Sequence, residues 1–119
     1  MVEVDAKKQI YSLTYREIEC IMLIAQGMNN QDICASLCIS QPTLKTHMNN
    51  FYSKLGMWQG KENPNSVRRV QVTLYFLKHE KEILKRYNLI KLKEKHRREL
   101  EELNKIIKLT KERDRYERI

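Results

Sequence analysis

Apolar residues recur at helical spacing between residues 14 and 56. Thr14 and Glu17 have the three-residue separation of a capping box, which predicts that a helix begins at residue 15. One apolar face follows at spacings of three and four residues: Ile18, Ile21, Met22 and Ala25. Gly27 can adopt the positive φ that ends a helix. We therefore expect a first helix over residues 15–26.

Two more short helices follow in the same segment. Asn30 is the expected N-cap of the first of them, whose inward residues are Ile33, Cys34 and Leu37. Residues 38–39 form a tight turn, and Ser40 caps the next helix, where Pro42 is tolerated in the first turn. This helix has a single apolar stripe: Leu44, Met48, Phe51 and Leu55. It ends at Gly56, so three short helices share one core.

The remainder of the chain changes in composition after residue 56. Residues 57–65 contain a glycine and a proline and are mostly polar, which predicts a loop. Residues 66–119 contain neither glycine nor proline and are rich in Lys, Glu, Arg and Leu, which predicts long helix. We expect an all-α fold, in which a 12-residue N-terminal arm precedes a domain at 13–56 of three short helices. A fourth helix and a long basic extension follow.

The helical extension offers apolar rows for pairing. Val67, Val70, Leu74 and Leu77 fit an a/d seam, which Lys81 interrupts. Further along, apolar residues step by three and four in a pattern closer to an eleven-residue than to a seven-residue repeat. We expect a homodimer without a regular left-handed supercoil. Its candidate contacts are Val70, Leu74, Leu77, Leu100, Leu103 and Ile107.

The net charge of +8 indicates a polyanionic partner, because a basic face gains affinity by releasing counterions from nucleic acid. Its location narrows this interpretation. Residues 1–65 have six basic and six acidic side chains, and residues 99–119 have six of each. The excess therefore lies in residues 66–98, where eleven basic side chains face three acidic ones.

The segment LTYREIECIMLIAQGMNNQDICASLCISQPTLKTHMNNFYSKLG, residues 13–56, resembles the LuxR/GerE (FixJ/NarL) helix-turn-helix of bacterial transcription factors without a gap over 44 residues. Residues typical of that family include Leu13, Thr14, Glu17, Gly27, Ile39, Ser40, Lys45, Tyr52, Leu55 and Gly56. The resemblance implies a sequence-specific DNA-binding transcriptional regulator in the bacterial cytoplasm. Double-stranded DNA would be its partner, with the recognition helix at about residues 41–55 in the major groove.

Candidate DNA contacts follow from the face opposite the apolar stripe and from the resemblance. Base edges are expected to meet Lys45, Thr46, Asn49 and Asn50, because amide, ammonium and methyl groups match adenine, guanine and thymine. Phosphates are expected near the helix starts and one lysine: Asn30, Gln31, Ser40, Gln41, Thr43 and Lys54. Arg69 stands where the family has a small alanine at its usual dimer contact, which puts that contact in doubt.

Other functions stay open. The chain could be an assembly protein that docks RNA polymerase or another protein through the helix-turn-helix, or a non-specific DNA or RNA binder that uses the basic helix. Gly-rich phosphate loops, buried carboxylate pairs and activated nucleophiles are absent, so we expect no enzyme and no small-molecule ligand. Cys34 and Cys38 lack two further metal ligands, and His47 lacks a partner at ligand spacing. We expect no metal, cofactor, disulfide or membrane span, and thiols that pack as small hydrophobes.

Overall fold

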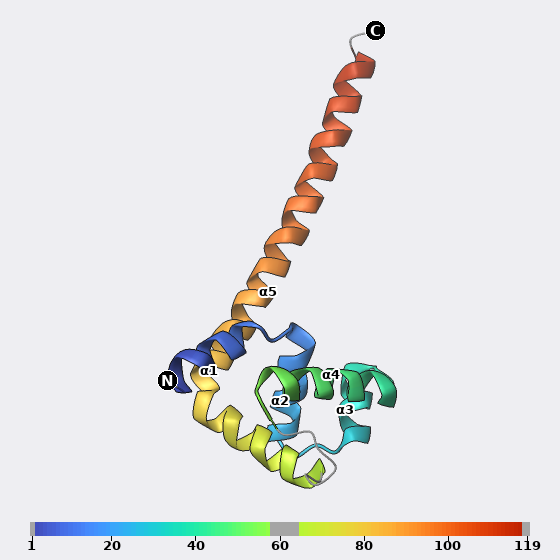
Figure 1. Ribbon diagram of the computed structural model, residues 1–119. Coiled ribbons are helices and arrows are strands. Elements are labelled where there is room, and N and C mark those ends of the chain that lie inside the picture. The colour runs from blue at the N-terminus through green and yellow to red at the C-terminus, as the bar shows by residue number, and fades with distance from the viewer. Residues whose placement is uncertain (1, 58–64, 118–119) are drawn as a thin grey trace. The chain divides into compact units, whose positions relative to one another are not determined.

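The computed structural model describes the backbone of residues 2–57 and 65–117, and the side chains of residues 6–57 and 66–113 (Figure 1). Its helices are α1 (Val2–Tyr11), α2 (Tyr15–Ala25), α3 (Asn30–Leu37), α4 (Gln41–Lys54) and α5 (Asn65–Glu117). All regular elements in this part of the chain are helices, which confirms the all-α prediction. Most of the predicted loop at 57–65 lies outside the described residues.

Helix α2 begins at the predicted capping box. The Thr14 hydroxyl accepts from the Glu17 amide at 3.2 Å, and the Glu17 carboxylate accepts from the Thr14 amide at 2.8 Å. Gly27 follows the helix with a φ of 88°. The predicted inward face was partly wrong: Cys20 and Ile24 are buried in place of Met22 and Ala25, which are half-buried. The buried arc is rotated because α2 packs against both α3 and α4.

Helices α3 and α4 form the helix-turn-helix. The N-cap of α3 is Asn29 rather than the predicted Asn30, because the Asn29 side chain accepts from the Asp32 amide at 2.8 Å. Cys38 makes the tight turn with a φ of 55°. Ser40 caps α4 as predicted and accepts from the Thr43 amide at 3.3 Å. The predicted α4 stripe is confirmed as buried: Leu44, Met48, Phe51 and Leu55.

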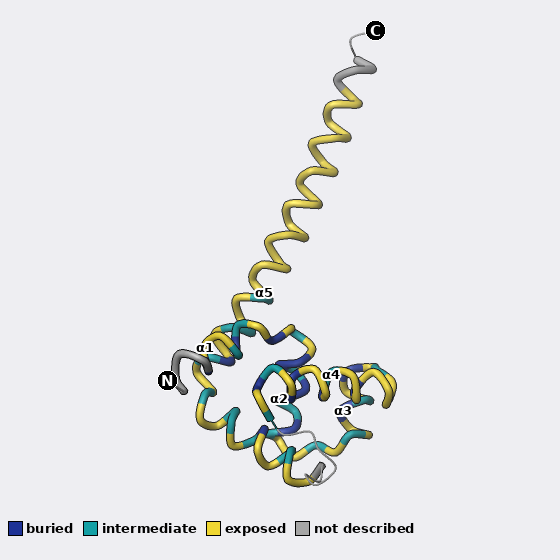
Figure 2. The backbone as a smooth tube through the Cα atoms, in the orientation of Figure 1, coloured by how far each residue is buried: buried dark blue, intermediate teal, exposed yellow. Residues whose placement is uncertain are grey.

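The compact unit containing these helices extends from residue 1 to Tyr87, well beyond the expected boundary at residue 56. The segment expected as an N-terminal arm is mostly the helix α1, whose Ile10 is 1% exposed. Val72 and Ile83 of α5 are fully buried in the same unit. Figure 2 shows other buried segments of this unit in the region of α1, α2 and α4. Hydrophobic periodicity did not predict this packing, because only two aliphatic residues of α5 are buried here. The other side chains on the same side of the helix include half-buried aromatic residues and arginines.

The apolar row predicted as the start of a seam lies on the opposite, outer side of α5. Val67, Val70, Leu74 and Leu77 are 43–61% exposed. Near the end of this row, His79 has non-helical backbone angles, with φ of −117° and ψ of 23°, so α5 is interrupted there. The apolar row thus ends close to the point where Lys81 breaks the sequence pattern.

The second compact unit, residues 88–119, contains the rest of α5. Every described side chain from residue 91 to residue 113 is exposed, including Leu100, Leu103 and Ile107. Two ion pairs one helical turn apart join Glu94 to Arg97 and to Arg98 at 3.8 and 4.0 Å. Such exposed pairs stabilise a helix only slightly. None of the side chains described from residue 91 to residue 113 is buried in a core.

Candidate nucleic-acid interface

The four residues predicted to contact bases share the solvent-facing side of α4. Lys45, Thr46, Asn49 and Asn50 are all exposed, whereas the apolar stripe of the same helix is buried. The Thr46 hydroxyl donates to the Pro42 carbonyl at 3.1 Å, which leaves its methyl group for an apolar contact. The structure therefore brings an ammonium, a methyl group and two amides onto one helix face.

The starts of α3 and α4 provide further polar groups. Gln31, Gln41 and Thr43 are exposed, as their predicted contact with phosphates requires. Ser40 is exposed too, but its hydroxyl caps α4 and donates to the Thr43 hydroxyl at 2.9 Å. The backbone amides of the first turn of α4, rather than the Ser40 side chain, are therefore the natural anion donors.

Asn30 has a different environment from the other predicted phosphate contacts. Its amide oxygen accepts from Arg69 Nη1 at 2.7 Å, and Arg69 Nη2 donates to the Met28 carbonyl. The guanidinium of α5 thus holds the start of α3 in place. Sequence reasoning singled out Arg69 only as a departure from the family pattern. Its tertiary partners explain that departure, because here the position faces the helix-turn-helix.

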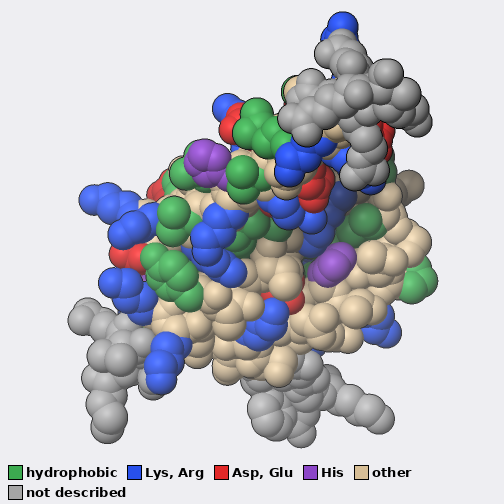
Figure 3. Space-filling view, turned by 90° about the horizontal axis from the view of Figure 1, so that it is seen from above, with side chains coloured by type: hydrophobic (Ala, Val, Ile, Leu, Met, Phe, Trp, Pro, Cys, Tyr) green, Lys and Arg blue, Asp and Glu red, His purple; other side chains and the backbone are tan. Residues whose placement is uncertain are grey.

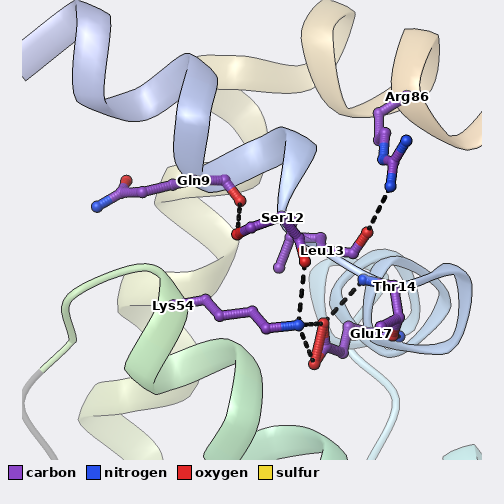
Figure 4. Close-up of polar contacts among 7 residues, drawn as sticks. All are labelled: Gln9, Ser12, Leu13, Thr14, Glu17, Lys54 and Arg86. Atoms are coloured by element: carbon purple, nitrogen blue, oxygen red, sulfur yellow. Dashed lines mark hydrogen bonds and ion pairs between the residues drawn. The ribbon is translucent and has the colours of Figure 1, made fainter.

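Lys54 lies within the internal polar network of the domain (Figure 4). Its ammonium contacts the Glu17 carboxylate at 2.7 and 3.2 Å and donates to the Ser12 carbonyl at 3.0 Å. The Glu17 side chain is only 2% exposed, so this ion pair is buried on the carboxylate side. The Lys54 ammonium, which we predicted to contact phosphate, is instead the partner of a buried carboxylate. The candidate interface therefore does not include Lys54.

Basic residues near the start of α5 bring positive charge to the helix-turn-helix. The Arg68 guanidinium lies 5.3 Å from the centre of the Tyr52 ring, a cation–π geometry that places it against α4. Arg69 lies at the start of α3. Lys and Arg side chains are spread among hydrophobic ones over the face drawn in Figure 3. Part of the basic segment found in the sequence therefore lies against the nearly neutral helix-turn-helix.

The cysteines differ from one another in exposure. Burial raises the pKa of the Cys20 thiol to about 12, as expected for a packed thiol. Cys34 is half-buried, and Cys38 is exposed, so the expectation of buried thiols was wrong for Cys38. Among the described residues, no three His, Cys, Asp or Glu side chains cluster as metal ligands would. No helix in the described part of the chain is both long and apolar enough to cross a membrane.

Part of the chain is similar in sequence to part of several bacterial proteins that are named as regulators. "Transcriptional regulatory protein LnrK" of Bacillus subtilis is 36% identical over 55 residues, which cover 46% of this chain and 25% of the relative. "Uncharacterized transcriptional regulatory protein YhcZ" of the same organism is 45% identical over 49 residues, which cover 41% and 23%. "Response regulator protein VraR" of Staphylococcus aureus is 37% identical over 67 residues, which cover 56% and 28%.

The match is confined to one part of each protein. The chain spans about a quarter of the length of these curated relatives. No solved structure matches it significantly. The profile described as "Bacterial regulatory proteins, luxR family" matches residues 11–62, which contain the capped helices α2, α3 and α4. Residues 11–62 of this chain are therefore a helix-turn-helix domain of the luxR family.

Proposed function

We propose that this protein is a sequence-specific DNA-binding transcriptional regulator that reads the major groove with α4. The observation that carries the proposal is the exposed row of Lys45, Thr46, Asn49 and Asn50 on the last helix of a luxR-family helix-turn-helix. Recognition helices of this motif contact base edges mainly through their N-terminal residues. Gln31, Gln41, Thr43 and the first-turn amides of α4 would fix the register on phosphates.

Selection of bound sequences from random double-stranded DNA tests the proposal. An enriched motif is expected, and Asn49→Ala and Thr46→Ala should each weaken binding to it by about fivefold or more, because one base contact contributes about 1–3 kcal/mol. Ser53→Ala is the matched control, since Ser53 is exposed near the C-terminal end of α4. Failure to enrich any motif would refute sequence-specific recognition and favour the assembly protein. Equal competition by RNA would favour a non-specific nucleic-acid binder.

We further propose that the protein acts as a homodimer held by the exposed apolar rows of α5. In the first unit these residues are Val70, Leu74 and Leu77, and in the second they are Leu100, Leu103 and Ile107. Support comes from the second unit, because a solvated helix without tertiary packing is only marginally stable, and pairing would bury its apolar row. Two recognition helices could then meet half-sites about 34 Å apart.

Light scattering with size-exclusion chromatography tests the dimer on the full chain. The double variants L74S/L77S and L100S/L103S report separately on the two rows, and the control L84S alters an apolar residue outside the predicted rows that is 36% exposed. A dimer that dissociates in either double variant but not in the control supports the proposal. A monomeric parent protein, or a dimer unaffected by both double variants, would overturn it.

A further inference from the structure

A cavity of about 580 Å³ runs along α4 from Gln41 to Tyr52, between the start of α3 and the first turn of α5, all within the first compact unit. Its walls are largely apolar, with Pro42, Leu44 and Met48 contributed by α4. Cavities of about 300–1,000 Å³ with apolar walls and a few polar groups are typical of small-molecule sites. The sequence did not suggest a ligand site, because the cavity forms only when the basic helix packs across the helix-turn-helix.

Tyr52 and Arg68 line this cavity, and each has a buried hydrogen-bond donor with no partner among the described residues. Tyr52 is 1% exposed, and its hydroxyl makes no hydrogen bond there. Arg68 Nε is also buried and unpaired, although the guanidinium lies over the Tyr52 ring. Buried donors are rarely left unpaired, since each costs about 1–3 kcal/mol. An acceptor bound in the cavity would satisfy both donors once the two side chains turn toward it, because both residues line its wall.

The charges around the cavity narrow the chemistry of that acceptor. Arg68 and Lys45 both line it and are cationic, and none of the lining residues that the structure describes is acidic. Burial raises the pKa of Tyr52, so its hydroxyl stays a donor at neutral pH. A carboxylate can accept from both a guanidinium and a hydroxyl, and it forms stronger hydrogen bonds than a neutral acceptor. The apolar walls suit a flat hydrocarbon group.

We propose that this cavity binds a small aromatic carboxylate, with the carboxylate accepting hydrogen bonds from Arg68 Nε and the Tyr52 hydroxyl and the ring packing on Leu44 and Met48. Binding would also affect the DNA-reading surface, because Lys45 and Asn49 line the same cavity. A bound carboxylate would neutralise positive charge beside these two candidate base contacts. We therefore expect the bound carboxylate to weaken DNA binding, and this expectation rests on the proposed function.

Isothermal titration of the full chain with 2-naphthoate tests the site directly, and 2-naphthamide serves as its uncharged analogue. We expect saturable binding of the carboxylate and at least about tenfold weaker binding of the amide. Tyr52→Phe and Arg68→Gln should each weaken 2-naphthoate binding by about fivefold or more, since one hydrogen bond contributes about 1 kcal/mol or more. Tyr52→Phe keeps the ring in the core, and circular dichroism checks that both variants are folded.

Arg86→Gln is the matched control. Arg86 also belongs to α5 and lies over a tyrosine ring, with its guanidinium 5.8 Å from the centre of Tyr11, but it does not line the cavity. Binding by this variant should stay within about twofold of the parent protein. The proposal is overturned if 2-naphthoate does not bind, if the amide binds equally well, or if R86Q loses as much affinity as R68Q and Y52F.

A second titration separates this site from the proposed function. Adding 2-naphthoate to the complex with the selected DNA should release the DNA from the parent protein, but not from folded Y52F at the same concentration. Unchanged DNA binding when the parent protein is saturated with 2-naphthoate would refute the coupling. Binding of 2-naphthoate by a chain that selects no DNA sequence would support the site while refuting the proposed function, so the two failures are distinguishable.

Discussion

Replacing Lys54 with methionine should destabilise the first unit, because the Glu17 carboxylate would remain buried without its cation. Methionine keeps an unbranched apolar side chain but removes the ammonium that lies 2.7 Å from the carboxylate. A hydrogen bond to a charged group contributes about 1.5–3 kcal/mol, and breaking a fully buried pair costs about 3–5 kcal/mol. The lysine side is 32% exposed. Water therefore screens the pair, and we expect a loss of about 2 kcal/mol.

Urea unfolding followed by circular dichroism measures this loss. A destabilisation of about 2 kcal/mol should lower the unfolding midpoint by about 1–2 M, given slopes of about 1–2 kcal/mol/M for a small unit. Lys45→Met makes the same chemical change on the same helix at an exposed position. That control should change stability by less than about 0.5 kcal/mol.

A double-mutant cycle with Glu17→Gln shows whether the two side chains act as a pair. Glutamine can keep the capping interaction with the Thr14 amide while losing the charge. The double variant E17Q/K54M should lose less stability than the sum of the single variants, with a coupling of about 1 kcal/mol or more. Additive losses, or a K54M variant as stable as K45M, would refute the argument that Lys54 has an internal role.

Three further predictions concern the stability of the first unit and the exposure of its cysteines. Asn29→Ala should cost about 1 kcal/mol by removing the α3 cap, with Asn50→Ala nearly neutral in the same urea titration. Equal effects would contradict the cap assignment. Phe51→Ala should lower the free energy of unfolding by about 3–5 kcal/mol, because the Phe51 ring is fully buried. A much smaller loss would show that neighbouring side chains fill the space left by the ring. Mass spectrometry after alkylation near pH 8 should find Cys38 modified and Cys20 protected until urea is added. Early Cys20 labelling would contradict its burial.

The local features of the helix-turn-helix could be predicted from the sequence because they depend on residues close together in the chain. The Thr14–Glu17 box, the Ser40 cap and the buried stripe of α4 each follow from spacings of three or four residues. The exposure of the predicted base contacts follows from the same periodicity, since it places them opposite the stripe. The predicted N-cap of α3, Asn30, was wrong by only one position.

The role of α5 could not be predicted in this way. Sequence periodicity selected its most apolar row for pairing, whereas the domain packs on the side containing Val72, Ile83 and half-buried aromatic and arginine side chains. Aromatic rings and arginine stems can bury much apolar surface while keeping polar tips in contact with backbone or water. A pattern that scores arginine and tyrosine as polar therefore does not show that the first compact unit extends into α5.

Contacts between residues far apart in the sequence decided which polar side chains have partners within the fold. The sequence determined that a neutral helix-turn-helix precedes a basic helix, and it identified the candidate base contacts on α4. Only the tertiary structure brought Glu17 to Lys54, Asn30 to Arg69, and Tyr52 to Arg68. The physical reason is that each side chain could equally have faced solvent. Packing of α5 and α1 around the three short helices determined which of these polar side chains have partners within the fold.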